Sequence, residues 1–214
     1  MMRLLAISDM HGDLTNLWEG MRASHPDLLL CCGDWGDPGM VTFDAFQSVL
    51  SQVPVLTVYG NHDDVNLLSA LRNTDGSLVL LPTGHICQRD GLIFAGISGI
   101  WAKSHRKPYY ITDEDTAHIA AELAGKGVDV LMSHGCPIGL ADAIPGGRHG
   151  GQRSFLNAFH VISPRLYLCG HLHVPQERTL KDGCIIINVG YTCKGDYWVI
   201  DVAGKSIEAQ HYKL

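Results

Sequence analysis

The sequence predicts an α/β fold built as a single domain over residues 1–214. The length is typical of one domain, and two patterns indicate the fold class. In the first third, short apolar runs alternate with amphipathic stretches of helix length, which indicates parallel strands joined by helices. The C-terminal third holds more strand-like runs separated by short turns, which indicates a second, partly antiparallel sheet. The expected strands cover residues 3–8, 27–32, 53–59, 91–97, 128–133, 165–169, 184–188 and 196–202.

Helices are expected between several of these runs. Asp13 has the side chain of a helix N-cap and stands just before the first helical stretch. Thr112 and Asp115 have the spacing of a capping box, and Gly125 suits the end of the helix that they begin. The expected helices cover residues 14–23, 41–51, 64–71 and 112–124.

Composition and charge exclude some classes of function. The net charge is −6, which argues against a protein whose main task is to hold nucleic acid, because that task needs clustered Lys and Arg. No apolar run approaches the roughly 18 residues that a membrane span needs. The N-terminal stretch meets Asp9 too early for a signal peptide, so a cytoplasmic location is expected.

The seven cysteines predict neither a disulfide framework nor a thiolate metal site. Their number is odd, no two form a Cys-x-x-Cys pair, and most stand in apolar runs. Scattered buried thiols in a reducing compartment explain this pattern best. Metal ligands, if present, must therefore come from other side chains.

Polar residues follow five of the expected strands at the point where each strand ends. The carboxyl ends of strands in an open α/β sheet are where ligands bind, so these five tips are expected to converge on one place. They carry Asp9 and His11, then Asp34, then Asn61, His62 and Asp63, then His134, and last His171 and His173.

The residue types at these tips predict a metal centre. Asp9 and His11 stand two residues apart, and in an extended segment such a pair points to the same side. His171 and His173 have the same spacing. Carboxylate, amide and imidazole ligands without thiolate suit Mn, Fe, Zn, Co or Ni. There are too many for one tetrahedral ion, whereas two ions that share a bridging carboxylate would use them all.

The five motifs in this order resemble the calcineurin-like metallophosphoesterase superfamily. Asp-x-His, Gly-Asp, Gly-Asn-His-Asp, a lone His and Gly-His-x-His occur between Asp9 and His173, which spans most of the chain. A single Gly-Asn-His would be a weak signal, but five motifs in register are a strong one. The chain is most similar to the small, uncapped microbial members. The resemblance implies a two-sheet αββα sandwich of mixed β-sheets flanked by helices, and hydrolysis of phosphate esters.

The resemblance also implies two divalent metal ions as cofactors. Manganese is favoured, with Fe, Zn, Ni or Co as alternatives. A metal-bound hydroxide would attack phosphorus in line with the leaving group. The implied ligands are Asp9, His11 and His173 for the first ion, Asn61, His134 and His171 for the second, and Asp34 as the bridge.

Two further residues of the Gly-Asn-His-Asp motif are implied to be catalytic. His62 would donate a proton to the leaving oxygen or hydrogen-bond the phosphoryl group. Asp63 would orient the His62 ring, although it could also cap the helix over residues 64–71. The glycines beside the ligands would supply tight turns; they are Gly33, Gly60 and Gly170.

Two loops are candidates for binding the rest of the substrate. His105 stands in a stretch of basic and aromatic residues, which could grip a phosphate or stack on a base. Arg148 and His149 stand in a glycine-rich stretch between His134 and His171. Each of these loops could instead be an ordinary exposed loop.

The expected substrate is a small phosphate ester, with nucleotides among the candidates. A phosphodiester is favoured over a monoester, because the segment from His149 to Phe159 resembles a subgroup linked to hydrolysis of cyclic nucleotides and other diesters. Protein phosphatase activity is not expected, because protein phosphatases carry an Arg soon after Gly-Asp and this chain has Trp35 and Gly36 there. A monoesterase acting on small metabolites is the alternative, and a nuclease or a non-catalytic adaptor on the same fold is a more distant one. No membrane and no stable nucleic-acid partner are expected, and the oligomeric state is left open.

Overall fold

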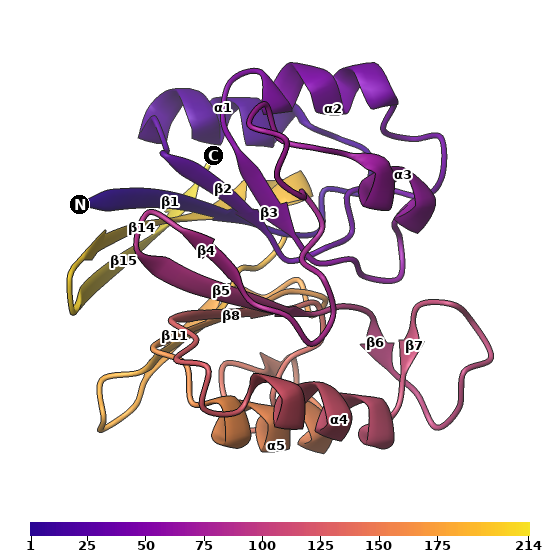
Figure 1. Cartoon of the computed structure of the whole chain (residues 1–214), viewed down its shortest axis with the longest axis vertical. Helices are drawn as coiled ribbons and strands as arrows, with labels where there is room; N and C mark the ends of the chain where they lie inside the picture. The colour runs from indigo at the N-terminus through magenta and orange to yellow at the C-terminus, as the bar shows by residue number, and fades with distance from the viewer.

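Two β-sheets pack face to face, and helices cover the outer face of each sheet (Figure 1). This computed structural model describes residues 1–214. Helices α1 (Thr15–Ser24), α2 (Phe43–Leu50) and α3 (Val65–Ala70) lie over the first sheet, and α4 (Asp113–Leu123) and α5 (Arg153–Ile162) lie over the second. The αββα sandwich of mixed sheets is confirmed.

The first sheet has the order β15-β14-β1-β2-β3. Its strands β1, β2 and β3 are parallel, as the alternation of strands and helices predicts. Strand β14 pairs antiparallel with β1 and forms a hairpin with β15. The bounds are β1 Met2–Ile7, β2 Leu28–Cys31, β3 Val55–Thr57, β14 Asp196–Ala203 and β15 Ser206–Lys213.

The second sheet has the order β12-β13-β11-β8-β5-β4, and its four central strands are parallel. The edge strands β12 and β4 are antiparallel to their neighbours. The bounds are β4 Cys87–Arg89, β5 Leu92–Ile97, β8 Val130–Ser133, β11 Leu166–Cys169, β12 Gln176–Thr179 and β13 Ile185–Asn188.

The predicted second, partly antiparallel sheet is present, but the C-terminal third supplies only part of it. That sheet already begins with β4 and β5, and the last two strands belong to the first sheet. After β13 the chain passes through the short 3-10 helix η1 (Thr192–Lys194) and then Gly195, whose φ of 95° reverses its direction. Apolar alternation identifies β14 as a strand, but it carries no information on which sheet edge the strand joins.

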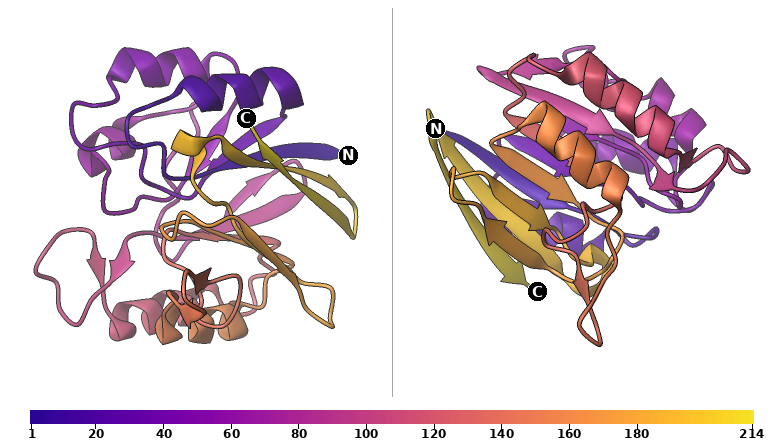
Figure 2. Two further views of the ribbon diagram at one scale, coloured as in Figure 1. Left: turned by 180° about the vertical axis from the view of Figure 1, so that it is seen from behind. Right: turned by 90° about the horizontal axis from the view of Figure 1, so that it is seen from below.

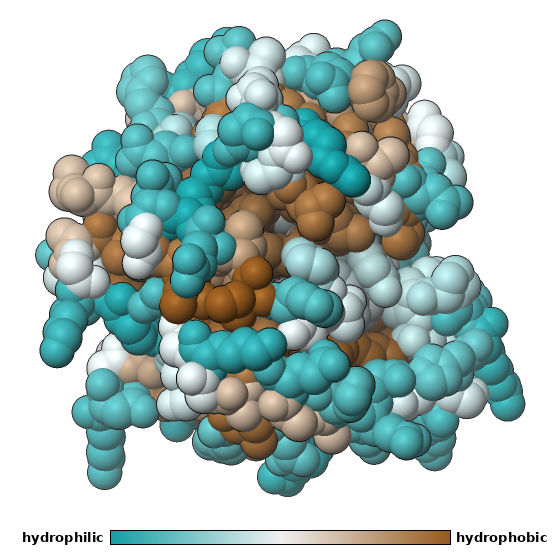
Figure 3. All heavy atoms as spheres, viewed as in Figure 1, coloured by the Kyte–Doolittle hydropathy of each residue, from teal (hydrophilic) through white to brown (hydrophobic).

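Alternating side chains of the central strands divide the core into three layers. Along β1, Leu4 faces the other sheet, whereas Leu5 and Ile7 face the helices α1 and α2. Strands with both faces buried are apolar throughout, as these are. A third layer lies between the second sheet and helices α4 and α5. Apolar residues are visible between the two halves in the space-filling view, while most of the outer surface is hydrophilic (Figure 3).

The first residues of the helices can be compared with the predicted N-caps. The capping box of Thr112 and Asp115 is present at α4. Helix α1 begins one residue later than predicted; Leu14 is its N-cap, and Asp13 accepts a hydrogen bond from the Thr15 amide at 2.9 Å. Asp64, rather than Asp63, caps α3 by accepting from the amide of Leu67.

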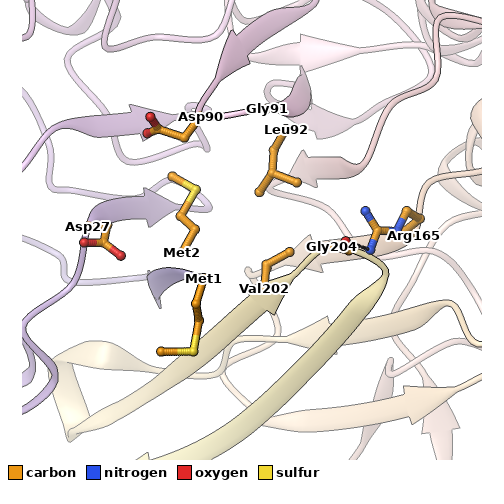
Figure 4. Close-up of a pocket in the computed structure, with 9 residues that line it drawn as sticks. All are labelled: Met1, Met2, Asp27, Asp90, Gly91, Leu92, Arg165, Val202 and Gly204. Atoms are coloured by element: carbon orange, nitrogen blue, oxygen red, sulfur yellow. Dashed lines mark hydrogen bonds between the residues drawn. The ribbon is translucent and has the colours of Figure 1, made fainter.

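A pocket of about 540 Å³ opens at the amino ends of the parallel strands, at the opposite end of the sandwich from the predicted metal ligands (Figure 4). Its one basic side chain, Arg165, is held by Asp129 at 2.8 Å and by the carbonyl of Gly204 at 2.7 Å. This pocket therefore offers no free positive charge to a phosphate. None of the helices combines the length and the apolar composition needed to cross a membrane.

Candidate metal centre

The five polar strand ends converge at one edge of the sandwich, as predicted. Within the first sheet, the amides of Met10 and His11 donate to the carbonyl of Asp34 at 2.9 and 3.1 Å. Between the sheets, His134 Nδ1 bonds to the carbonyl of Cys32 at 2.7 Å, and the amide of His171 donates to Asp9 Oδ2 at 3.0 Å. These bonds hold the loops after β1, β2, β8 and β11 together.

Most of the predicted ligands have left-handed backbone conformations. The values of φ are 59° at Asp9, 48° at His11, 58° at Asp34, 67° at His171 and 55° at His173. Non-glycine residues adopt this region rarely, and Asp and His do so more readily than most. The assumption that each pair stands in an extended segment is therefore wrong; sharp local turns bring the side chains together. Strained conformations of this kind cluster at functional sites.

The first group of ligand atoms comes from Asp9, His11 and His173, whose donor atoms all lie within 4.8 Å of one another. His11 Nε2 and His173 Nε2 are 3.4 Å apart, and Asp9 Oδ1 lies 3.1 Å from His173 Nε2. Two nitrogens bound at about 2.0–2.1 Å to one tetrahedral zinc ion would have about this separation. The carboxylate of Asp9 is fully buried, whereas the two rings reach the surface.

The second group combines Asp34 with residues from both sheets. Asp34 Oδ2 lies 3.4 Å from His134 Nε2, and the rings of His134 and His171 have centroids 5.0 Å apart. Asn61 Oδ1 and His134 Nε2 are buried without a hydrogen-bond partner. Buried polar atoms are nearly always paired, so these two orphaned atoms fit a bound cation. An oxygen of Asp34 lies within 4.8 Å of ligand atoms of Asp9 and His134, and also within 4.8 Å of ligand atoms of His11 and His62. This position between two groups of possible ligands is the one expected of a carboxylate that bridges two ions.

The electrostatics of the second group depend on the pair of His134 and Asp34. Burial lowers the pKa of His134, but the interaction with the Asp34 carboxylate, 3.4 Å from Nε2, outweighs it and raises this pKa to about 9. Burial raises the pKa of Asp34, yet the same pairing holds it well below its usual range. Burial, followed by the charge of His134, lowers the pKa of His171 to about 4. A cation bound here would displace the proton of His134.

His62 contacts Asp37, a residue that the sequence analysis did not assign to the site. His62 Nδ1 lies 3.0 Å from Asp37 Oδ1, and the His62 side chain is 43% exposed. The amide of His62 donates to Asp34 Oδ1 at 2.8 Å, which fixes the ring beside the shared carboxylate. The available signal was a carboxylate three residues after Asp34, in the segment Gly33-Asp34-Trp35-Gly36-Asp37.

Asp63 does not orient the His62 ring, contrary to the prediction. Its carboxylate accepts three backbone amide hydrogen bonds, from Gly60 at 2.7 Å and from Asp34 and Trp35 at 2.8 Å each. Burial raises the pKa of Asp63 to about 7, although these amides act in the other direction. Asp63 therefore ties the loop after β3 to the loop after β2, and it positions ligands through the backbone.

The glycine of the Gly-Asn-His-Asp motif is required by close packing rather than by its turn. A Cβ atom on Gly60 would lie 2.2 Å from Asp34 Oδ1 and 2.6 Å from the His134 ring, and its φ is not left-handed. Gly170 is similar, since its Cβ would lie 2.0 Å from Ser8 Oγ. Glycine at these positions lets ligand side chains of one loop pack against the backbone of another.

Tyr191, which follows β13, was also missed. Its ring stacks on His173 with centroids 4.1 Å apart and planes 12° from parallel, and it meets His11 edge-on at 5.8 Å. Asp196 holds the segment by accepting from the Tyr191 amide at 3.1 Å. This contact joins residues far apart in the chain, and no motif marked it.

We expect Tyr191→Leu to weaken binding of the first ion, because the ring packs against two of its ligands. Loss of a residue that orients metal ligands typically costs about 10- to 100-fold in metal affinity. Calorimetric titration with Mn²⁺ would measure the change, with Tyr191→Phe as the matched control that keeps the ring. Equal affinities for the Leu and Phe variants would show that the stack has no such role.

The three candidate substrate residues lie in two different surroundings. His105 bonds to Asp115 at the start of α4, and no contact joins it to the metal ligands. His149 lies on a hairpin and bonds to the buried Asp142, and its neighbour Arg148 is exposed. The structure thus brings the seven predicted ligands and His62 together, and it leaves His105 outside this cluster.

Comparison with known proteins assigns the family. Residues 2–202 match the calcineurin-like phosphoesterase superfamily domain. The chain belongs to that superfamily. The superfamily consists of metal-dependent phosphoesterases, and the clustered carboxylates and imidazoles described above are candidate ligands for their metals. A comparison with curated protein sequences found no match.

Solved structures with this fold share little sequence with the chain. TT1561 of Thermus thermophilus superposes with a TM-score of 0.73 at 14% identity, covering 98% of both chains. A dimetal phosphatase from Danio rerio gives 0.60 at 12% identity, covering 99% of this chain and 98% of its own. Vps29 of Entamoeba histolytica in complex with zinc gives 0.52 at 10% identity, covering 99% of both chains. At these identities the likeness establishes the fold alone.

Proposed function

We propose that the protein hydrolyses phosphodiesters with two divalent metal ions. The observation that carries this proposal is the pair of buried atoms that make no hydrogen bond, Asn61 Oδ1 and His134 Nε2, the second of which is grouped with the ligand atoms of Asp9 and Asp34. Such atoms are costly unless a cation completes them. Asp9, His11 and His173 would hold the first ion, Asn61, His134 and His171 the second, and Asp34 both.

The protein side chains around this centre have separate tasks. When bound, the ions supply positive charge to the phosphoryl oxygens and lower the pKa of water. His62 donates a proton to the leaving oxygen, because it lies beside the ligands and is not needed to hold an ion. Asp37 keeps the ring in place through Nδ1, which leaves Nε2 for the substrate.

The charges around the site support a diester rather than a monoester. No Lys or Arg lies within ion-pair distance of the predicted ligands, whose charged neighbours are all Asp and His. A monoester carries about −1.5 to −2 near pH 7, so it gains more from added cations than a singly charged diester does. The rim is also open, since the His173 side chain is 38% exposed.

Manganese is the proposed native metal. The predicted ligands are carboxylate, amide and imidazole groups, which suit manganese. None of them is a thiolate, so the site does not favour a metal that prefers sulfur ligands. Iron, zinc, nickel and cobalt accept the same donors. The substrate is proposed to be a small ester, which the open rim would admit.

A monoesterase acting on small metabolites is the second candidate function. Its support is the resemblance in fold to the dimetal phosphatase from Danio rerio. A non-catalytic adaptor is disfavoured, because such a protein has no need to retain Asp34, His62 and the orphaned ligand atoms.

Initial rates on bis-p-nitrophenyl phosphate and p-nitrophenyl phosphate, measured with Mn²⁺, test the proposal. We expect faster cleavage of the diester, with all activity lost after addition of a chelator and restored by excess metal. Faster cleavage of the monoester would favour the second candidate. No cleavage of either ester with any of the five metals would contradict both.

A further inference from the structure

A short hairpin between β8 and α5 is attached to both segments that carry histidines of the second ligand set. Strands β9 (Ala143–Ile144) and β10 (Arg148–His149) pair antiparallel and lead directly into α5 (Figure 2). The Gln152 amide donates to the carbonyl of Cys136 at 2.8 Å, two residues after His134.

The other attachment is to the loop after β11. A Cβ atom on Gly150 would lie 2.8 Å from Leu172 Cδ2, so this backbone touches the residue that stands between His171 and His173. Gln176 further fixes the hairpin by bonding to both the amide and the carbonyl of Ala143, at 2.9 and 2.8 Å. The hairpin is therefore held beside the predicted metal centre.

This hairpin carries a second His–Asp pair. Asp142 Oδ1 lies 2.8 Å from His149 Nδ1, and Asp142 Oδ2 accepts from the Gly151 amide at 3.0 Å. The Asp142 side chain is 2% exposed, whereas the ring of His149 is 57% exposed. A buried carboxylate needs a partner that donates, and His149 supplies it from Nδ1. Nε2 is then the ring atom left for a ligand.

The two His–Asp pairs come from opposite halves of the sandwich. His62 and Asp37 follow strands of the first sheet, whereas Asp142 and His149 follow β8 of the second. Each pair has a carboxylate on Nδ1 and an exposed ring, but only Asp142 is buried, whereas the Asp37 side chain is 58% exposed. Arg148, next to His149, is exposed and has no ion pair, so the second pair has a free positive charge beside it.

We propose that His149, held by Asp142, binds a second anionic group of the substrate, a phosphate other than the one that reacts. The substrate class is then a phosphodiester that bears a further phosphate, such as a phosphorylated nucleotide ester. This inference rests on the proposed function, because it assumes that the first phosphoryl group lies at the metal ligands. In its protonated form the ring donates from Nε2, and such charge-assisted hydrogen bonds are the strong ones.

Binding of two nucleotides to the Mn²⁺-loaded protein tests the inference without relying on turnover. Calorimetric titration would compare thymidine 5′-phosphate with thymidine 3′,5′-bisphosphate, which differ by one phosphate. In the wild type we expect the bisphosphate to bind about tenfold more tightly, the amount that one hydrogen bond to a charged group supplies. In His149→Gln the two affinities should become about equal.

His160→Gln is the matched control, since it makes the same change at an exposed histidine of α5. It should keep the wild-type preference. Adding Asp142→Asn to His149→Gln should lower the preference no further, because Asp142 acts through the ring. Equal affinities in the wild type, or a tenfold preference that survives in His149→Gln, would overturn the inference.

The two proposals fail in different ways. Diester hydrolysis combined with equal nucleotide affinities would overturn the role of His149 and leave the proposed function standing. A tenfold preference that depends on His149, found in a protein that hydrolyses neither test ester, would retain the anion-binding role and contradict the proposed function.

Discussion

Replacing Asp34 by Asn should nearly abolish turnover. The substitution removes the charge that both predicted ion sites share, and it keeps the size of the side chain. It also leaves His134 Nε2 beside a neutral amide, where the present separation is 3.4 Å to a carboxylate oxygen. Because bound metals supply several kcal/mol of transition-state stabilisation, we expect the rate on bis-p-nitrophenyl phosphate to fall by about 10³-fold or more.

Rates with saturating Mn²⁺ would measure this effect, and Asp44→Asn provides the control. Asp44 is an exposed carboxylate in the first turn of α2, so its replacement tests the charge change alone. Thermal unfolding of both variants in the presence of chelator would confirm that they fold. A rate for Asp34→Asn within about tenfold of wild type would contradict the assignment of the shared ligand.

Replacing His62 by Ala should lower the rate by about 10²- to 10⁴-fold, the usual contribution of a general acid. The loss should be greatest for esters of poor leaving groups, which depend most on a proton at the leaving oxygen. Metal affinity should change little, because both proposed ligand sets are complete without His62, although its ring lies within 4.8 Å of ligand atoms of His11 and Asp34. Rates on aryl and alkyl diesters, with metal content measured in parallel, separate these effects.

Asp37→Asn should give a smaller loss of the same kind, because Asp37 acts by holding the His62 ring. The double variant should be no slower than His62→Ala. His118→Ala removes an exposed histidine of α4, at 75% side-chain exposure, and serves as the control. An equal loss for aryl and alkyl leaving groups in His62→Ala would argue against its role as an acid.

Much of the fold followed from local patterns in the sequence. All eight expected strands are present, because strands buried on both faces are apolar throughout and end at polar tips. Helix α5 and the hairpin before it were not expected. The helix starts after Gln152 without a side-chain cap, and the glycine-rich segment that precedes it shows no periodic pattern of apolar residues.

The sequence predicted which strand ends meet at the candidate site. The convergence of Asp9, Asp34 and the histidines follows from parallel strands, which place their carboxyl ends at one edge. The contacts of individual side chains did not follow. Asp63 was paired with its sequence neighbour His62, but folding turns its carboxylate toward three amides.

Residues that the sequence analysis missed make contacts that depend on strand pairing or on a turn. Tyr191 reaches His173 only because β13 lies beside β11 in the second sheet. Asp142 reaches His149 through a hairpin with six residues between them, and no pattern in the sequence predicted its turn. The periodic pattern of apolar residues does not indicate that these side chains are in contact. Only the folded structure shows these contacts.

Titration of the metal-free protein with Mn²⁺, followed by electron paramagnetic resonance, tests the dinuclear centre most directly. We expect two ions per chain and the signal of a spin-coupled pair, because Asp34 would join the two ions. In Asp34→Asn the coupled signal should disappear. One ion per chain in the wild type, or a coupled signal that persists in Asp34→Asn, would contradict a centre bridged by Asp34.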